Sequence, residues 1–137
     1  MTELELNEAR RLMEAIVEAE AKLKMLRLSV QKLVPILDGM PRAKNQRSKV
    51  EELTAKIIAT EEEVLSLREE FYQASLRLQE AIFDSNLDAS SKSILFLRYA
   101  ACLNFSEIQV ELKMTRSTIF YLHRTAKKKI LNQIKLD

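Results

Sequence analysis

Two long stretches of the chain place apolar residues at alternating four- and three-residue steps, the pattern of an a/d heptad seam. The first seam consists of Leu12, Ile16, Ala19, Leu23, Leu26, Val30, Leu33 and Leu37. The second consists of Val50, Leu53, Ile57, Thr60, Val64, Leu67, Phe71, Ala74, Leu78 and Ala81. We expect two long helices that fold back as an antiparallel hairpin, because neither helix buries its stripe alone.

Proline, glycine and capping residues predict where these helices end. Pro35 lacks a backbone donor, so the first helix should end or kink there. The segment 38–47 begins Asp-Gly-Met-Pro and continues polar and basic, which predicts a break and a loop. Ser48 and Glu51 form a capping-box pattern for the second helix, which should extend to about Phe83.

Further apolar residues flank the second seam, namely Ile58, Leu65, Tyr72 and Leu76. They make the apolar stripe wider than a two-helix contact needs. This width favours a homo-dimer or higher oligomer, in which two hairpins form a four-helix assembly. The hairpin then serves as a stalk or oligomerisation element; a docking surface for another protein is the alternative, and no residue marks it.

The last third of the chain changes rhythm. Asp88 is placed to cap a helix over residues 89–101. Asn104 and Glu107 repeat the capping-box pattern before a short helix that should end at 112–113. These short elements contrast with the long heptad stretches and predict a separate C-terminal domain.

A third helix should begin after Thr115 and run to about Ile134. A short helix, a tight turn and a longer basic helix make the helix-turn-helix pattern. The residues expected to hold the two helices at a fixed crossing are Ile108, Leu112, Met114, Ile119, Leu122, Ala126 and Ile130.

Composition and charge agree with this division. The 137 residues include one Gly and two Pro, which suits long helices rather than a β-sandwich or barrel. Residues 1–86 hold 13 basic and 16 acidic residues, a net charge of −3. Residues 87–137 hold 9 basic and 4 acidic residues, a net charge of +5. This asymmetry points to a polyanionic partner, double-stranded DNA, for the C-terminal part.

The DNA-facing residues follow from the positions left outside the apolar face. They are Thr115, Arg116, Ser117, Thr118, Phe120, Tyr121, Arg124, Lys127 and Lys128. Arg116 is suited to a guanine edge, and Thr118 or Phe120 to a thymine methyl group. The lysines are suited to phosphates, although a lysine run near a helix C-terminus is also favoured by the helix dipole. Phe120 and Tyr121 could instead pack against the hairpin or a second subunit.

No pattern of catalytic or metal-ligating residues is visible. Cys102 is the one cysteine and is expected to be a small buried hydrophobic residue. His123 is the one histidine, expected at the surface or at a phosphate. The run 61–63 of three glutamates reads as a solvated helix face. We therefore expect no enzyme, cofactor or metal. Without an 18-residue apolar run or a signal peptide, we expect no membrane association and a cytoplasmic location.

The C-terminal residues also resemble a known family. The segments that carry the resemblance are Ile94-Leu95-Phe96-Leu97-Arg98-Tyr99, Leu103-Asn104-Phe105-Ser106-Glu107-Ile108 and Met114-Thr115-Arg116-Ser117-Thr118-Ile119. They resemble region 4 of sigma-70-type sigma factors, which reads the promoter −35 element. The run Ile119-Phe120-Tyr121-Leu122-His123-Arg124 behind a long helical hairpin looks more like the small phage late-gene activators of the RinA/ArpU type. The resemblance implies a phage or prophage regulator in a bacterial host that binds a promoter and assists RNA polymerase.

Carried over by position, the family's DNA-reading residues fall on Arg116, Ser117, Thr118, Phe120 and Tyr121. Two residues depart from the family pattern. Gln109 stands where a small residue is usual, and Lys113 stands in the turn where Gly is common. Either residue is expected to widen or distort the helix crossing.

The sequence thus predicts an all-α protein with two parts. Residues 1–86 form the oligomerising hairpin, and residues 87–137 form a sigma-region-4-like DNA-binding domain. Two alternatives remain. A phage small-terminase-like protein would recognise packaging DNA, although such proteins usually carry the DNA-binding module first. A helical adaptor would bind RNA polymerase without reading DNA.

Overall fold

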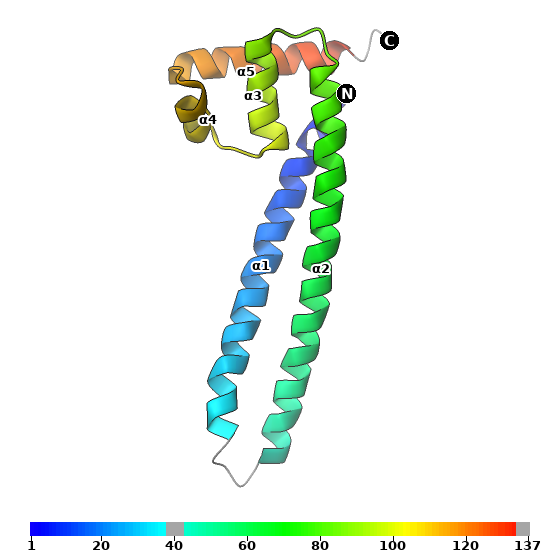
Figure 1. The fold of residues 1–137 in the computed structure, drawn as a ribbon, viewed down its shortest axis with the longest axis vertical. Helices are drawn as coiled ribbons and strands as arrows, with labels where there is room; N and C mark the ends of the chain where they lie inside the picture. Colours follow the sequence, from blue (N-terminus) through cyan, green and yellow to red (C-terminus); the bar gives the residue numbers. More distant parts are fainter. Residues whose placement is uncertain (38–42, 134–137) are drawn as a thin grey trace. The chain divides into compact units, whose positions relative to one another are not determined.

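All regular secondary structure in the described part of the chain is helical. The computed structural model describes residues 1–37 and 43–133, without the side chains of 34–37, 43–46 and 133. Two long helices come first and shorter helices follow (Figure 1). The predicted all-α fold, a helical hairpin before a C-terminal helical region, is confirmed.

Helix α1 spans Glu3–Leu37 and begins at a side-chain cap. The Thr2 hydroxyl accepts a hydrogen bond from the backbone N–H of Glu5 at 3.2 Å, which satisfies one donor of the first turn. Of the two outcomes predicted at Pro35, an end or a kink, the end is wrong, since α1 continues to Leu37. Proline has a φ angle close to the helical value and removes a single hydrogen bond, and this loss does not end a long helix within its last turn.

Helix α2 spans Ala43–Phe83 and ends where the sequence predicts. Its start is earlier than predicted, so Ser48 lies inside the helix and the capping box with Glu51 is wrong, as is a loop as far as residue 47. Residues 43–47 contain neither Gly nor Pro, and most of them are strong helix formers. The predicted break at 38–41 lies outside the described residues.

The chain forms two compact units, one of residues 14–69 and one of residues 1–13 with 70–137. In the unit 14–69, α1 and α2 run antiparallel (Figure 1). The buried side chains there belong to the predicted seams: Ile16, Ala19, Leu23, Thr60 and Val64. Exposed ion pairs flank them, Arg27 with Glu61 and Arg68 with Glu20. Such pairs contribute about 0–1 kcal/mol each, so the apolar seam supplies most of the stability.

Helix α3, Ala89–Leu95, continues into the π-helical segment η1, Phe96–Ala100. The predicted cap is confirmed: Asp88 Oδ1 accepts from the Ser91 N–H at 2.9 Å, and hydrogen bonds from Ser91 lower the Asp88 pKa. The single regular α-helix predicted for 89–101 is wrong. Leu95 and Ala100, five residues apart, are buried in the same core, and the Ala101 N–H donates to the Phe96 carbonyl five residues before it. A π turn keeps residues five apart on one face, which explains the departure.

The remaining helices are α4, Phe105–Leu112, and α5, Arg116–Gln133. In Figure 1, α5 crosses α3, and α4 packs near the N-terminal end of α5. These are the short and long helices of the predicted helix-turn-helix. The sequence placed the end of the last helix near Ile134, which lies outside the described residues.

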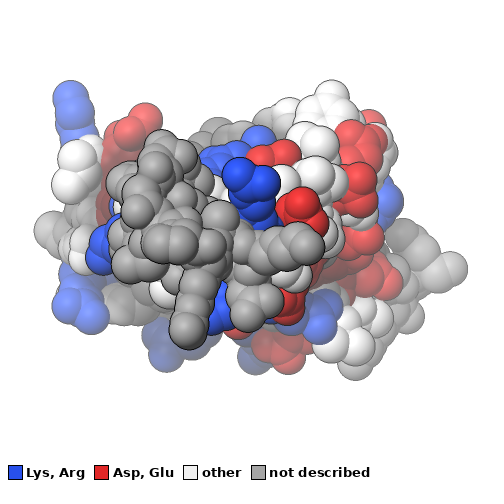
Figure 2. All heavy atoms as spheres, turned by 90° about the horizontal axis from the view of Figure 1, so that it is seen from below, with Lys and Arg blue, Asp and Glu red and all other residues white. Residues whose placement is uncertain are grey.

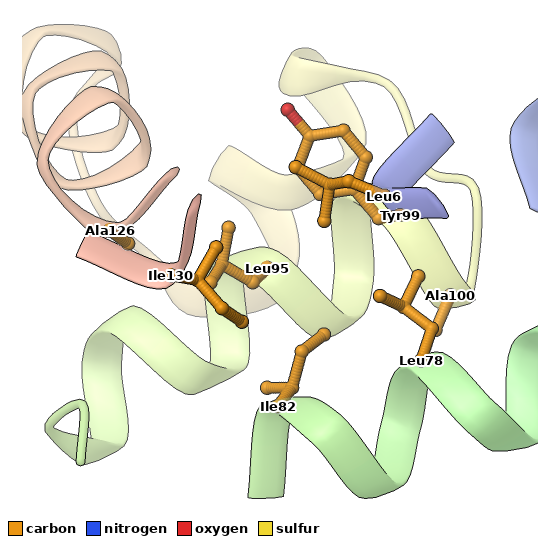
Figure 3. Close-up of a cluster of buried hydrophobic side chains, with 8 residues drawn as sticks. All are labelled: Leu6, Leu78, Ile82, Leu95, Tyr99, Ala100, Ala126 and Ile130. Atoms are coloured by element: carbon orange, nitrogen blue, oxygen red, sulfur yellow. The ribbon is translucent and has the colours of Figure 1, made fainter. Parts of the chain in front are cut away.

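The start of α1 and the end of α2 both contribute side chains to a core that also includes residues of α5. Eight buried side chains form this core (Figure 3): Leu6, Leu78, Ile82, Leu95, Tyr99, Ala100, Ala126 and Ile130. Leu6 comes from α1, whereas Leu78 and Ile82 come from α2. The sequence predicts a boundary at residue 86, but the compact units divide the chain elsewhere because this core includes residues from before that boundary.

The described helices include none that is both long and apolar enough to cross a membrane. Figure 2 shows basic and acidic side chains together on the face seen from below. That face therefore carries both signs of charge.

Candidate nucleic-acid interface

The helix α4 is fixed at its start by a complete capping box. The Asn104 side chain accepts from the Glu107 N–H at 2.8 Å, and the Glu107 carboxylate accepts from the Asn104 N–H at 3.2 Å. The sequence predicts this pair, and the structure confirms it. Two backbone donors of the first turn are thereby satisfied, so the start of α4 is well determined.

The turn between α4 and α5 depends on a left-handed residue. Lys113 has φ 54° and ψ 43°, and its N–H donates to the Gln109 carbonyl. Such a conformation brings the Cβ atom close to the neighbouring carbonyl oxygen and favours Gly. Lys113 stands where Gly is common, and it nevertheless adopts the left-handed conformation of the turn.

We expect Lys113→Gly to raise the free energy of unfolding by about 0.5–1 kcal/mol, since Gly removes the steric cost of the left-handed conformation. Part of the gain is offset by the larger entropy of Gly in the unfolded chain. Urea unfolding of the variant and the wild type measures the difference. Lys113→Ala is the control, because it loses the charge and keeps the Cβ atom. Equal stabilisation by both substitutions would contradict the steric explanation.

An apolar cluster holds α4 and α5 together. Ile94, Ile108 and Ile119 are fully buried in it, one from each of three helices. The partly buried residues around them are Leu97, Leu103, Phe105, Leu112, Met114 and Leu122. The predicted contacts of Ile108, Leu112, Met114, Ile119 and Leu122 are confirmed. This packing fixes α5 against α4. Gln109, within α4, is half-buried.

Helix α5 presents most of the predicted DNA-facing residues to solvent. Exposed are Thr115, Arg116, Ser117, Thr118, Phe120, Tyr121, Arg124 and Lys128. Thr115 is in the capping position: its hydroxyl accepts from the Thr118 N–H at 3.4 Å and lies 2.9 Å from the Thr118 hydroxyl. The N-terminal turn of α5 is therefore both ordered by its cap and open to a ligand.

Phe120 takes part in a stack of side chains as well as facing solvent. Its ring lies 4.7 Å from the Phe105 ring, between centroids. The Arg116 guanidinium carbon is 5.1 Å from the Phe120 centroid, and the Arg98 guanidinium carbon is 4.2 Å from the Phe105 centroid. Phe120 thus packs on α4 rather than on the long hairpin. The stack positions a guanidinium group at each end.

Lys127 is half-buried and has an ion-pair partner. Its ammonium group donates to Glu3 Oε1 at 2.9 Å, and this hydrogen bond raises the Lys127 pKa. The sequence assigns Lys127 to a DNA phosphate, and the structure places it against the first turn of α1. A phosphate would therefore compete with Glu3 for this lysine.

His123 is less exposed than the sequence predicts, which places it at the surface or at a phosphate. The ring is half-buried, Nε2 and the Tyr99 hydroxyl share a hydrogen bond of 2.7 Å, and the ring also contacts Phe105. Burial, followed by the charges of Lys127, Arg98 and Arg10, lowers the His123 pKa to about 4. The imidazole is neutral near pH 7 and adds no positive charge to the surface.

We expect stability to fall as the pH decreases from 6.5 towards 4. The unfolded chain protonates His123 near its usual pKa of 6.5, but the folded protein does so only near 4. The unfolded state binds more protons in this window, so the contribution of His123 is complete above pH 6.5 and is lost below it. Solvent screening of a half-buried ring limits the loss to about 1–2 kcal/mol. Urea unfolding between pH 7 and 5 should show a weaker pH dependence for His123→Gln; identical slopes would contradict this assignment.

The sequence did not identify Arg98, Tyr99 and Phe105 as part of this surface. A partial signal was present, since Phe120, His123 and Lys127 recur at helical spacing along α5. That spacing predicts a shared face but not its neighbours. The contacts with η1 and α4 depend on the tertiary packing.

Cys102 also differs from its prediction. It is half-buried rather than fully buried, and its φ angle is 62°. It follows η1, and the next N–H, that of Leu103, donates to the Leu97 carbonyl at 2.9 Å. The left-handed residue turns the chain out of η1 towards α4. Among the described residues, no group of His, Cys, Asp and Glu could hold a metal ion.

An apolar hollow lies on another part of the same unit. It has a volume of about 470 Å³ and is lined mainly by residues of α3, η1 and α4: Phe83, Ala89, Lys92, Ser93, Phe96, Leu97, Glu111 and Leu112. None of the predicted DNA-facing residues lines it. The hollow is therefore separate from the exposed face of α5.

Comparison with known proteins gives one match. No curated protein and no solved structure matches the chain. A family model described as "Protein of unknown function (DUF1492)" matches residues 40–132, which include the whole of α2 and nearly all of α5. This range covers more than half of the chain and includes the whole helix-turn-helix, so the chain belongs to the DUF1492 family.

Proposed function

We propose that this protein is a sequence-specific double-stranded DNA-binding regulator of transcription. The observation that supports the proposal most strongly is the capped N-terminal turn of α5, which exposes Arg116, Ser117 and Thr118 while Ile119 is fully buried. An α-helix fits the DNA major groove, and residues near the start of a recognition helix reach base edges there. The buried Ile119 fixes the inner face of α5, and the exposed polar residues of its first turn are available to base edges.

The exposed residues divide into two roles. Arg116, with its planar fork of donors, fits a guanine edge, and Thr118 or Tyr121 fits an adjacent base. Arg124 and Lys128 lie further along α5 and are suited to phosphates, which give affinity without sequence information. The resemblance to sigma region 4 and to RinA/ArpU-type activators supports a promoter as the target and host RNA polymerase as the partner.

We also propose that two copies associate through the hairpin. Ile58 and Leu65, one heptad apart on α2, are 53% and 62% exposed. A single chain thus leaves these large apolar side chains in water, and covering them would stabilise an assembly. Sedimentation equilibrium should give a dimer or larger species that Ile58→Gln/Leu65→Gln shifts towards monomer. A monomeric wild type at micromolar concentration would contradict this part of the proposal.

A helical adaptor is the second candidate function, and the apolar hollow favours it. Its lining by Phe83, Phe96 and Leu97 is suited to an apolar side chain of a protein partner. This function does not require α5 to read DNA. Recovery of the DNA fragments that the protein binds separates the two functions.

The test is recovery and sequencing of genomic and phage DNA fragments bound by the purified protein. We expect a shared motif upstream of genes, which Arg116→Ala/Thr118→Ala should abolish. Lys49→Ala is the matched control, since it removes an exposed positive charge from the other unit. Enrichment at one packaging locus would indicate the terminase-like function instead. No enrichment with any variant would contradict DNA reading and favour the adaptor.

A further inference from the structure

The first turns of α1 lie against the recognition helix α5. Glu3, Leu6 and Arg10 follow one another at three- and four-residue steps, so they share one face of α1. Glu3 pairs with Lys127 of α5, and Leu6 is fully buried in the core that includes Ala126. Figure 3 shows Leu6 beside Tyr99. Arg10 is the next residue along this face, one turn beyond Leu6.

Positive charges gather where α1, η1 and α5 meet. We define the basic cluster as Arg10, Arg98 and Lys127. The charges of all three lower the His123 pKa after burial, and the Arg98 pKa is lowered by burial and then by Arg10. The contacts agree with this grouping, since Arg98 lies 4.2 Å from the Phe105 centroid and the Phe105 ring lies 5.0 Å from the His123 ring.

Of the three positive side chains in the basic cluster, one has a carboxylate partner among the described residues. Within the described residues, Glu3 forms an ion pair with Lys127, whereas neither Arg10 nor Arg98 forms one with a carboxylate. Arg98 is held in place by the Leu103 carbonyl, to which its Nη1 donates at 3.1 Å, and by the Phe105 ring. Packing like charges together costs free energy unless an anion neutralises them. A preformed cluster of this kind is suited to an anionic ligand.

We propose that the basic cluster binds a phosphate of the DNA backbone next to the groove that α5 enters, so that α1 forms part of the DNA interface. This inference rests on the proposed function. It assigns a DNA contact to a helix that the sequence relates only to the hairpin. Two arginines with planar donor forks and one lysine are the side chains that phosphate oxygens prefer.

The distances within the aromatic stack support this placement. The steps from Arg116 to Phe120, Phe105 and Arg98 are 5.1, 4.7 and 4.2 Å, so the two guanidinium carbons lie within 14 Å of each other. The DNA major groove is about 12 Å wide. A side chain at a base edge and one at the groove border are separated by a similar distance. A position of Arg116 in the groove is therefore compatible with a contact of Arg98 to a flanking phosphate.

The experiment measures the affinity of the full-length protein for a short DNA duplex at salt concentrations between about 50 and 200 mM. Arg10→Gln is expected to weaken binding on the order of tenfold at the lower salt, and to reduce the slope of log K against log salt by about 0.9. Arg11→Gln is the matched control. It removes the same charge from the neighbouring, exposed position of α1 and should change neither quantity appreciably.

Glu3→Gln gives a test in the opposite direction. It removes the carboxylate that competes for Lys127, so DNA should bind more tightly than to the wild type. A purely structural role of the Glu3–Lys127 pair predicts unchanged or weaker binding, and that result would overturn the proposal. Urea unfolding of each variant reports any loss of stability separately.

The remaining outcomes separate this inference from the proposed function. If the wild type binds DNA and Arg10→Gln and Arg11→Gln behave alike, the basic cluster is not a DNA contact and the proposed function remains. If the wild type shows no salt-dependent DNA affinity, both fail. Calorimetry measures separately whether inorganic phosphate binds to the wild type and to Arg10→Gln. Phosphate binding that Arg10→Gln abolishes, without any effect of this variant on DNA, would identify a free-anion site and overturn the proposal.

Discussion

A fragment of residues 87–137 is expected to be largely unfolded, although the sequence predicts a domain with these boundaries. The fragment lacks Leu6, Leu78 and Ile82, which are buried against Leu95 and Ile130 in the full chain. Removal of one buried Leu or Ile side chain typically costs about 2–5 kcal/mol. Three such losses are comparable with the whole stability of a small domain, about 5–15 kcal/mol. Circular dichroism and thermal unfolding of the fragment and the full chain test this expectation.

Leu6→Ala in the full chain separates the packing of α1 from the effects of truncation. We expect a loss of about 2–5 kcal/mol in the free energy of unfolding, because Leu6 is 0% exposed. Leu4→Ala is the control, since Leu4 is on the same turn and 69% exposed, and it should change stability by less than about 0.5 kcal/mol.

A fragment 87–137 that unfolds cooperatively at the temperature of the full chain would show that α1 and α2 are dispensable for this fold.

The second large effect is expected from Ile119→Ala, which should lower stability by about 2–5 kcal/mol. Ile119 is fully buried between Ile94 and Ile108, at the centre of the contact between α3, α4 and α5. The cavity left by the substitution removes contacts on three helices at once. Urea unfolding measures the loss. A change below about 1 kcal/mol would show that this cluster does not hold the helix-turn-helix together.

Tyr121→Ala is the matched variant on the same helix. Tyr121 is 59% exposed, so its removal should alter stability by no more than about 0.5 kcal/mol. Under the proposed function it should nevertheless weaken binding to specific DNA. The pair of variants therefore distinguishes residues that build the recognition helix from residues that act on its surface.

Much of the fold could be predicted from local patterns. The heptad seams identify the two long helices, and the caps at Asp88 and Asn104 identify the starts of α3 and α4. These signals depend on residues within a few positions of one another. The wrong predictions were also local, since Pro35 and Ser48 carry typical boundary signals that the helices override. Capping and propensity terms are small, and the burial of a long apolar seam outweighs them.

The candidate interface was predicted in part. Exposed positions on α5 follow from helical periodicity, because the inner face of Ile119, Leu122 and Ala126 leaves the other side to solvent. The partners of that exposed face do not follow from periodicity. Phe105 and Arg98 stack on it from α4 and η1, and Glu3 reaches Lys127 across 124 positions of sequence. No local pattern encodes a contact over that separation.

The sequence by itself determined that the chain is helical, that two long amphipathic helices precede a helix-turn-helix, and that its positive charge gathers at the C-terminal end. Those features follow from residue type and spacing, which act over a few turns of one helix. Only the tertiary structure decided that the start of α1 packs under α5, that η1 takes a π turn and that His123 is half-buried. Each of these depends on which apolar faces meet, and the meeting faces come from distant parts of the chain.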